Sequence, residues 1–229
     1  MALLSDNDAG EVRKIFGALV SDVHVRVYTQ KLECPTCQDT ENILKELDEL
    51  SEKLKISFLN SLDNREEAEK DGVDKAPAII VSDGTNSRVK FYGTPSGYEF
   101  SSLLTTIIDT GGSEEPLTED TMQFLKELED DLNMQVFVTP TCPHCPSAAV
   151  LASRMARYSD KVKSEVIEAN EFPELSTKFR VQGVPRTVIN GKFYAEGSLP
   201  ESMMIQALKK GLEADPSEET NLMDYLQND

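Results

Sequence analysis

Apolar residues follow helix and strand spacings in the same order twice along the chain. Each half opens with a helix pattern, at residues 7–19 and 118–128, and continues with a β-branched strand, "VHVRVY" or "MQVFVT". A long helix, a strand, a short acidic helix, two adjacent strands and a closing helix then follow in both halves. Strands that alternate with helices in this way predict an α/β fold, with a mixed β-sheet flanked by helices in each half.

The two halves are copies of one structural unit. Cys34 and Cys37 match Cys142 and Cys145, which stand 108 residues later, and Pro77 matches Pro185 at the same offset. The strand patterns before the cysteines match at an offset of 109, so the first copy has one extra residue in the loop that follows. Differences of length confined to loops are typical of an internal structural repeat.

The repeat divides the chain into two domains, residues 1–112 and 113–229. The stretch "DTGGSEEPLTED" between them has the glycines, serine, proline and acids of a connecting segment. We place the boundary near Gly112. The residues after Asp215 are mostly polar, and we interpret them as a tail with at most a short helical turn.

Charge and hydropathy exclude several classes of function. The formal net charge is −18, from 23 Lys and Arg against 41 Asp and Glu, which disfavours nucleic acids and anionic membrane surfaces as partners. The chain has no run of 18 apolar residues, and its N-terminus lacks the basic start and apolar stretch of a secretory signal. We therefore expect a cytoplasmic protein that binds neither nucleic acid nor membranes.

All four cysteines lie in two Cys-x-x-Cys motifs, which suit either a metal site or a redox disulfide. Zinc-binding pairs usually stand about 12–20 residues apart, whereas here most of a structural unit separates Cys37 from Cys142. Each motif also follows a strand and opens a helix. This context favours redox chemistry without a metal, and a zinc-dependent scaffold or holdase remains the alternative from another class.

Local backbone chemistry supports the redox interpretation. Cys34 and Cys142 are expected at or just before a helix N-terminus, where unpaired N–H groups favour a thiolate. Pro35 and Pro143 then occupy the first helical position. The second cysteine of each motif, one turn further on, is close enough to resolve a mixed disulfide.

Two prolines provide an independent indication. Pro77 and Pro185 each precede a strand and each stand 43 residues after the first cysteine of their copy. A proline repeated at one offset indicates a structural role, and a cis bond reshapes a turn and exposes backbone groups. We therefore predict cis Ala76–Pro77 and Val184–Pro185 bonds.

These features together resemble a known family. "VFVTPTCPHCPSAAV" and "GVPRTVINGK" are similar to thioredoxin-fold sequences, and the whole chain resembles the protein disulfide oxidoreductases of archaea and some bacteria, glutaredoxin-like proteins of two tandem thioredoxin-like domains. Two departures from thioredoxin itself stand out. The chain has no tryptophan, and no acid replaces the buried aspartate of thioredoxin on the strand before either motif.

The resemblance implies thiol–disulfide exchange with protein substrates, as reductase, oxidase or isomerase. Cys34 and Cys142 attack, Cys37 and Cys145 resolve, and the backbone at Ala76 and Val184, before the two prolines, aligns the substrate chain. The glycines form no dinucleotide-binding pattern, so we expect no organic cofactor. A thioredoxin-reductase-like flavoenzyme is then the expected electron donor.

A competing interpretation is an electron relay dedicated to a peroxidase. The N-terminal module of bacterial hydroperoxide reductase flavoproteins also has two thioredoxin folds, but one of its two redox sites is lost. Both Cys-x-x-Cys pairs are intact in this sequence, which favours the general oxidoreductase.

The two sites differ in charge. Glu33, Asp39 and Glu41 surround the first motif, whereas the second has His144 between its cysteines and no acid from Cys142 to Asp160. A thiolate is favoured by positive and disfavoured by negative neighbours. We therefore predict that Cys142–Cys145 is the more oxidising pair.

Overall fold

The computed structural model describes residues 4–112, 117–214 and 219–226. The chain folds into two compact units: Met1–Ser96 with Leu103–Glu115, and Gly97–Ser102 with Pro116–Asp229. The expected domain boundary, between residues 112 and 113, lies at the edge of residues 113–116, which are outside the described residues. Each unit is described separately below.

The first unit has four strands. Strand order is β2-β1-β3-β4, in which β1 runs parallel to β2 and antiparallel to β3, and β3 pairs antiparallel with β4. The elements in chain order are α1 (Asp6–Phe16), β1 (Val23–Thr29), α2 (Cys37–Asp48), β2 (Leu54–Asn60), α3 (Arg65–Asp71), β3 (Ala78–Ser82), β4 (Val89–Tyr92) and α4 (Tyr98–Gly111), the last belonging to this unit from Leu103 onward.

The second unit repeats this arrangement and adds a short strand at its end. Strand order is β6-β5-β7-β8-β9, with β5 parallel to β6 and antiparallel to β7. The elements are α5 (Glu119–Glu127), β5 (Leu132–Val138), α6 (Cys145–Tyr158), β6 (Val162–Glu168), α7 (Pro173–Lys178), β7 (Arg186–Ile189), β8 (Phe193–Glu196), α8 (Glu201–Ala214), β9 (Thr220–Asn221) and the 3₁₀ helix η1 (Leu222–Tyr225).

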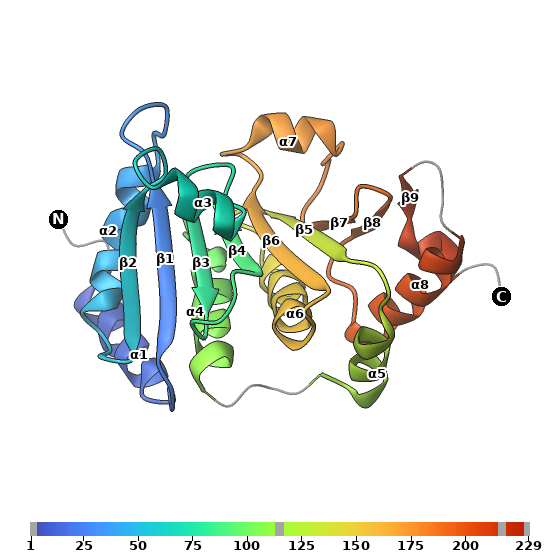
Figure 1. The fold of residues 1–229 in the computed structure, drawn as a ribbon, viewed down its shortest axis with the longest axis horizontal. Coiled ribbons are helices and arrows are strands. Elements are labelled where there is room, and N and C mark those ends of the chain that lie inside the picture. Colours follow the sequence, from blue (N-terminus) through green and yellow to red (C-terminus); the bar gives the residue numbers. More distant parts are fainter. Residues whose placement is uncertain (1–3, 113–116, 215–218, 227–229) are drawn as a thin grey trace. The chain divides into compact units, whose positions relative to one another are not determined.

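Helices cover both faces of the first sheet, which buries its central strands. In Figure 1, α3 lies in front of the strands, and α2 and α4 lie behind them. Val25, Val27 and Tyr28 of β1 are fully buried although successive side chains point to opposite faces. The predicted α/β class, with a mixed sheet flanked by helices in each unit, is confirmed.

Helix caps follow the sequence with one correction. Thr118 caps α5 as its position predicts, by accepting a hydrogen bond from the backbone N–H of Thr121. Helix α1 is capped by Ser5, two residues before the start of the helix pattern at residue 7, and Asp8 completes a capping box with it. The reciprocal hydrogen bonds of that box satisfy two backbone donors at once, which a lone acidic cap does not.

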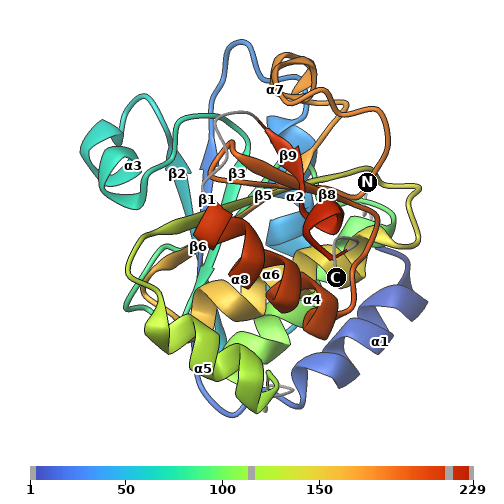
Figure 2. The ribbon, with the colours of Figure 1, turned by 90° about the vertical axis from the view of Figure 1, so that its right-hand side faces the viewer.

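The polar tail expected from composition contains the expected short helical turn, η1, and also a strand. β9 pairs in parallel with β8 (Figure 2). The next residue, Leu222, is fully buried. Tyr225 then packs against Phe193 with ring centroids 6.2 Å apart. A strand at a sheet edge leaves its backbone groups unpaired, and the second unit uses these residues to cover that edge of β8.

Within the described residues, no helix has the length and apolar character needed to cross a membrane.

Candidate redox sites

Both Cys-x-x-Cys motifs form disulfides at the same place in their units. Cys34–Cys37 follows β1 and Cys142–Cys145 follows β5, with Cα atoms 5.4 Å and 5.5 Å apart. In each unit the second cysteine begins the long helix, α2 or α6. The chain therefore presents a disulfide at the start of a helix in each unit, as the motifs predicted.

The prolines after the first cysteines lie two residues before the first helical position that was expected for them. Cys34 and Cys142 precede the helices, and Pro35 and Pro143 stand in the connecting turn instead of at the first helical position. In the second unit, the N–H of Cys145 donates to the carbonyl of Cys142 at 3.3 Å, which closes a tight turn between the two cysteines. The expected position of these prolines was therefore wrong.

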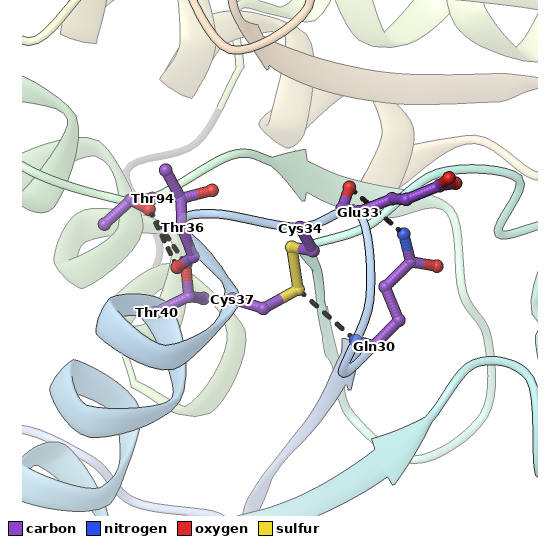
Figure 3. The surroundings of a disulfide bond; sticks show 7 residues. All are labelled: Gln30, Glu33, Cys34, Thr36, Cys37, Thr40 and Thr94. Carbon is purple, nitrogen blue, oxygen red and sulfur yellow. Dashed lines mark hydrogen bonds between the residues drawn. A yellow bond between two sulfur atoms is a disulfide. The ribbon is translucent and has the colours of Figure 1, made fainter.

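Backbone and threonine contacts hold the first disulfide (Figure 3). The backbone N–H of Gln30, at the exit of β1, donates to Cys37 Sγ at 3.3 Å. The buried Thr40 hydroxyl lies 3.1 Å from the Thr36 carbonyl and 3.0 Å from the Thr94 hydroxyl, so it ties the start of α2 to the segment after β4. Cys37 is buried and Cys34 half-buried, and their roles as resolving and attacking cysteine stay predictions.

The second disulfide lies against the loop before β7. Cys142 Sγ is 3.6 Å from the carbonyl oxygen of Val184. When the cysteine is reduced, its S–H can donate to that oxygen. Cys142 is 8% exposed and Cys145 fully buried, so this disulfide is the less accessible of the two.

The Ala76–Pro77 and Val184–Pro185 bonds are both cis. β3 begins directly after Pro77 and β7 directly after Pro185. The contact between Val184 and Cys142 places the second of these loops beside its cysteine. The roles of Ala76, Val184 and the two prolines in aligning a substrate chain stay predictions.

The charged residues near the two cysteine pairs differ in exposure and pairing, which the sequence does not show. Glu33, which has a positive φ of 58°, and Asp39 are exposed beside the first site, whereas Glu41 is paired with Lys45 at 2.5 Å. His144 is exposed at the N-cap of α6, and its imidazole makes no hydrogen bond to any described residue. A tuning role for His144 therefore stays a prediction, and Glu41 contributes less than its sequence position suggested.

A cavity of about 500 Å³ opens beside the first disulfide. It lies between the exits of β1 and β2 and the start of α2, and both cysteines of the pair border it. Its lining combines apolar and polar side chains: Thr29, Gln30, Lys31, Cys34, Cys37, Gln38, Glu41, Phe58, Leu59 and Asn60. Phe58 and Leu59, which are half-buried, correspond to the buried Val166 and Ile167 in the second unit. These two lining residues therefore differ between the two sites in both type and exposure.

Sequence reasoning missed one buried acid. Glu168 is the last residue of β6 and corresponds to Asn60 in the first unit. It is paired across the sheet with Val138 of β5, and Val138 stands four residues before Cys142. Glu168 is 4% exposed and accepts hydrogen bonds from the Glu171 N–H at 2.6 Å and the Asn170 amide at 2.8 Å. Burial, which disfavours the carboxylate, raises its pKa. An acid that ends a strand was the available signal.

Within residues 4–112, 117–214 and 219–226, no group of three or more His, Cys, Asp or Glu side chains is arranged to hold a metal ion. The two cysteine pairs each close within their own unit.

The chain is similar in sequence to known proteins. The thioredoxin domain family matches residues 132–210. The F subunit of alkyl hydroperoxide reductase from Escherichia coli (strain K12) is 26% identical over 211 residues, or 87% of this chain and 39% of that protein. The chain thus spans well under half the length of this relative.

Solved structures extend the similarity to both units. A protein disulfide oxidoreductase from Aeropyrum pernix K1 is 27% identical, with a TM-score of 0.85 over 92% of this chain and 94% of that one. The F subunit of the alkylhydroperoxide reductase from Enterococcus faecalis (V583) shares the fold, with 24% identity and a TM-score of 0.82 over 90% and 99% of the two chains. The chain is therefore a protein of two tandem thioredoxin-like units, each with a Cys-x-x-Cys disulfide at the start of a helix.

Proposed function

We propose that this protein is a thiol–disulfide oxidoreductase that exchanges electrons with disulfides of other proteins at both of its Cys-x-x-Cys sites. The observation that carries the proposal is the repetition of one arrangement: each unit has a disulfide directly before a long helix and a proline loop that begins the third strand of its sheet. Similarity to a protein disulfide oxidoreductase over 92% of the chain supports it.

The reaction transfers two electrons to the substrate disulfide. In the reduced first site, the Cys34 thiolate attacks one sulfur of the substrate disulfide and expels the other as a thiolate, which takes up a proton. Cys37 then loses its proton and attacks Cys34 Sγ, which releases the second substrate thiolate and forms the Cys34–Cys37 disulfide. Cys142 and Cys145 act in the same way at the second site. An external dithiol returns each pair to the reduced state, and a thioredoxin-reductase-like flavoenzyme is our proposed donor.

The resolving cysteines are arranged for the second step. Cys37 is 4% exposed and Cys145 is fully buried, so a substrate disulfide reaches the first cysteine of each pair more easily. Gln30 donates its backbone N–H to Cys37 Sγ, and hydrogen bonds to the charged form favour a thiolate. No organic cofactor is needed for these steps.

The surroundings of the sites favour a substrate with an extended chain. The Val184 carbonyl next to Cys142 is a backbone acceptor of the kind to which an extended peptide can hydrogen-bond. The 500 Å³ cavity beside Cys34 can take a side chain that flanks the substrate cysteine. We therefore propose protein disulfides, in preference to small disulfides, as the substrates.

A second candidate is an electron relay to a peroxidase. It is favoured by the similarity of 87% of the chain to a protein named as the F subunit of an alkyl hydroperoxide reductase. In that case one external partner, a peroxidase, oxidises the sites, and the protein has little activity on other disulfides. The presence of a closed cysteine pair in each unit favours the first proposal.

The experiment compares four forms of the chain: the unaltered protein, Cys34→Ser/Cys37→Ser, Cys142→Ser/Cys145→Ser and the variant with all four changes. We expect the unaltered protein to accelerate insulin disulfide reduction by dithiothreitol, and each double variant to retain the activity of its intact site. Loss of both pairs is the control and reduces the rate to that of dithiothreitol alone. An unaltered protein no faster than this control contradicts the proposal.

Two further measurements separate the alternatives. A relay predicts rapid oxidation of the reduced protein by a purified peroxidase and hydroperoxide, with a rate on insulin near background. A zinc scaffold predicts stoichiometric metal in the purified protein and protection of all four thiols from alkylation, and either result argues against the oxidoreductase.

A further inference from the structure

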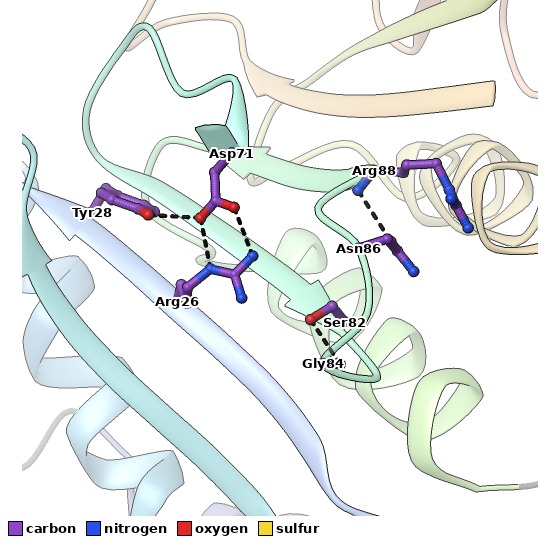
Figure 4. A network of polar contacts seen from close by, with 7 residues as sticks. All are labelled: Arg26, Tyr28, Asp71, Ser82, Gly84, Asn86 and Arg88. Atoms are coloured by element: carbon purple, nitrogen blue, oxygen red, sulfur yellow. Dashed lines mark hydrogen bonds and ion pairs between the residues drawn. The ribbon is translucent and has the colours of Figure 1, made fainter. Parts of the chain in front are cut away.

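Two buried side chains and one half-buried side chain form a polar network in the first unit, and neither cysteine takes part in it (Figure 4). Arg26 of β1 donates from Nε and Nη2 to the two carboxylate oxygens of Asp71, at 2.6 Å and 2.9 Å. The Tyr28 hydroxyl donates to the same carboxylate at 2.6 Å. Asp71 ends α3 and is 9% exposed, and Tyr28 is fully buried.

The network joins the two segments that lead into the first redox site. Tyr28 is two residues before Gln30, whose N–H donates to Cys37 Sγ. Asp71 is six residues before Pro77, in the segment that ends in the cis bond. Tyr28 is also paired across the sheet with Ala78, the residue after that proline. A shift of Asp71 against β1 therefore moves the loop of Pro77 relative to the exit of β1.

The second unit shows that this fold does not require a polar contact here. Phe137 stands in the place of Tyr28 and Phe179 in the place of Asp71, and their rings pack with centroids 5.7 Å apart. Gln135 replaces Arg26 and donates instead to Glu165 at 2.9 Å. The same two segments are thus joined by an apolar contact in one unit and by an ion pair with a tyrosine in the other.

Stability alone does not account for the polar version. Removing charges from water is costly, and replacing a buried ion pair by well-packed apolar groups is often neutral or stabilising. What an ion pair with two parallel hydrogen bonds adds is direction, because a bidentate arginine–carboxylate contact tolerates little displacement. A cavity of about 250 Å³ borders Arg26, Tyr28 and Asp71.

We propose that Arg26, Tyr28 and Asp71 are positioning residues for the Cys34–Cys37 site, which fix the Pro77 loop against the exit of β1. They touch neither cysteine and act through the backbone segments that they join. The inference rests on the proposed function in that it concerns the same site. It assigns to the first unit an ion pair and a tyrosine contact that the second unit replaces by an aromatic contact.

The test uses the Cys142→Ser/Cys145→Ser chain, in which only the first site reacts. Asp71→Asn and Tyr28→Phe each break the network, and the triple change Arg26→Gln/Tyr28→Phe/Asp71→Phe introduces the residues of the second unit. The measurements are kcat/KM for insulin reduction and the rate at which iodoacetamide alkylates reduced Cys34. A tenfold effect is a reasonable scale, because a displacement of about 1 Å can cost as much as 100-fold in rate.

We expect Asp71→Asn to lower kcat/KM and to change the alkylation rate of Cys34 by about 3–10-fold, Tyr28→Phe to do so less, and the triple variant to restore most of both. The same changes in the Cys34→Ser/Cys37→Ser chain leave the second site unaltered. A Cys34 alkylation rate within twofold of the parent in folded Asp71→Asn and Tyr28→Phe overturns the proposal. So does an equal loss at both sites, since that is the pattern of general destabilisation.

The alkylation rate requires no substrate turnover. If the parent protein does not reduce insulin, the proposed function fails while the positioning role is still decided by the reactivity of Cys34. If Asp71→Asn does not fold, Tyr28→Phe, which removes only a hydroxyl, decides the question.

Discussion

The difference between the two redox sites yields a prediction whose size follows from the exposure of the charges around them. Glu33 and Asp39 are exposed beside Cys34, and His144 is exposed beside Cys142. Glu41 drops out because it is paired with Lys45. The changes to make are Asp39→Asn at the first site and His144→Ala at the second, with Asp22→Asn, an exposed acid at the opposite end of β1, as the control.

The magnitude is set by charges that act through water. At roughly 6–8 Å and a dielectric constant of about 80, one unit charge changes the energy of a thiolate by about 0.5–0.7 kcal/mol. For a two-electron couple, 1.4 kcal/mol corresponds to about 30 mV, so each charge is worth about 10–15 mV. The two exposed acids, Glu33 and Asp39, then make Cys142–Cys145 the more oxidising pair by about 20–30 mV at low salt, and by less at high salt. An imidazolium at His144 adds about 10–15 mV.

Burial acts in the opposite direction. Cys142 is 8% exposed whereas Cys34 is half-buried, and removal from water disfavours the thiolate. The difference in potential calculated from charge alone is therefore an upper bound on the difference to be measured. The reduced Cys142 can also donate to the Val184 carbonyl, a contact that favours the thiol.

The assay is a redox titration of each pair in the chain that lacks the other, at low and high salt, together with the alkylation rate of each first cysteine. We expect His144→Ala to lower the potential of the second pair, Asp39→Asn to raise that of the first, and Asp22→Asn to change neither. A higher potential for Cys34–Cys37 in the unaltered protein refutes the charge argument and identifies burial as the dominant effect.

Three other changes test burial and backbone conformation elsewhere in the two units. Burial raises the pKa of Glu168 above its unfolded value, so the folded protein loses stability as pH rises from the unfolded to the folded pKa of this carboxyl group. In urea titrations between pH 4 and pH 8, the stability of Glu168→Gln should therefore rise relative to that of the parent as the pH increases. A difference in unfolding free energy between the two proteins that does not change with pH would contradict this. Leu222→Ala should cost about 2–5 kcal/mol in the second unit because the side chain is fully buried, whereas the partly exposed Met223→Ala should cost less by thermal unfolding. Gly72→Ala should destabilise the first unit by about 1–2 kcal/mol, since φ is +64° there, while Gly10→Ala in α1, with open space around it, should not; equal effects would refute the backbone argument.

The candidate sites were accessible from sequence because their chemistry is local. Two cysteines three positions apart at a strand-to-helix junction can close a disulfide without help from distant residues, and both pairs do. The repeat also aligned Pro77 with Pro185, and the two stand at equivalent places in their units. Pro35 and Pro143 lie two residues before the first helical position instead of at it. In the second unit, a tight backbone turn between the two cysteines delays the start of the helix.

What the sequence alone determined is the order of helices and strands, the duplication and the two cysteine pairs, because periodicity, turn residues and motif spacing are properties of neighbouring residues. Tertiary structure decided the rest. It neutralised Glu41 with Lys45, left His144 in solvent, and buried Glu168 at the end of β6. It also joined Arg26 to Asp71 across 45 residues of chain. Charge, burial and pairing depend on which distant side chains meet, and only the packed units bring them together.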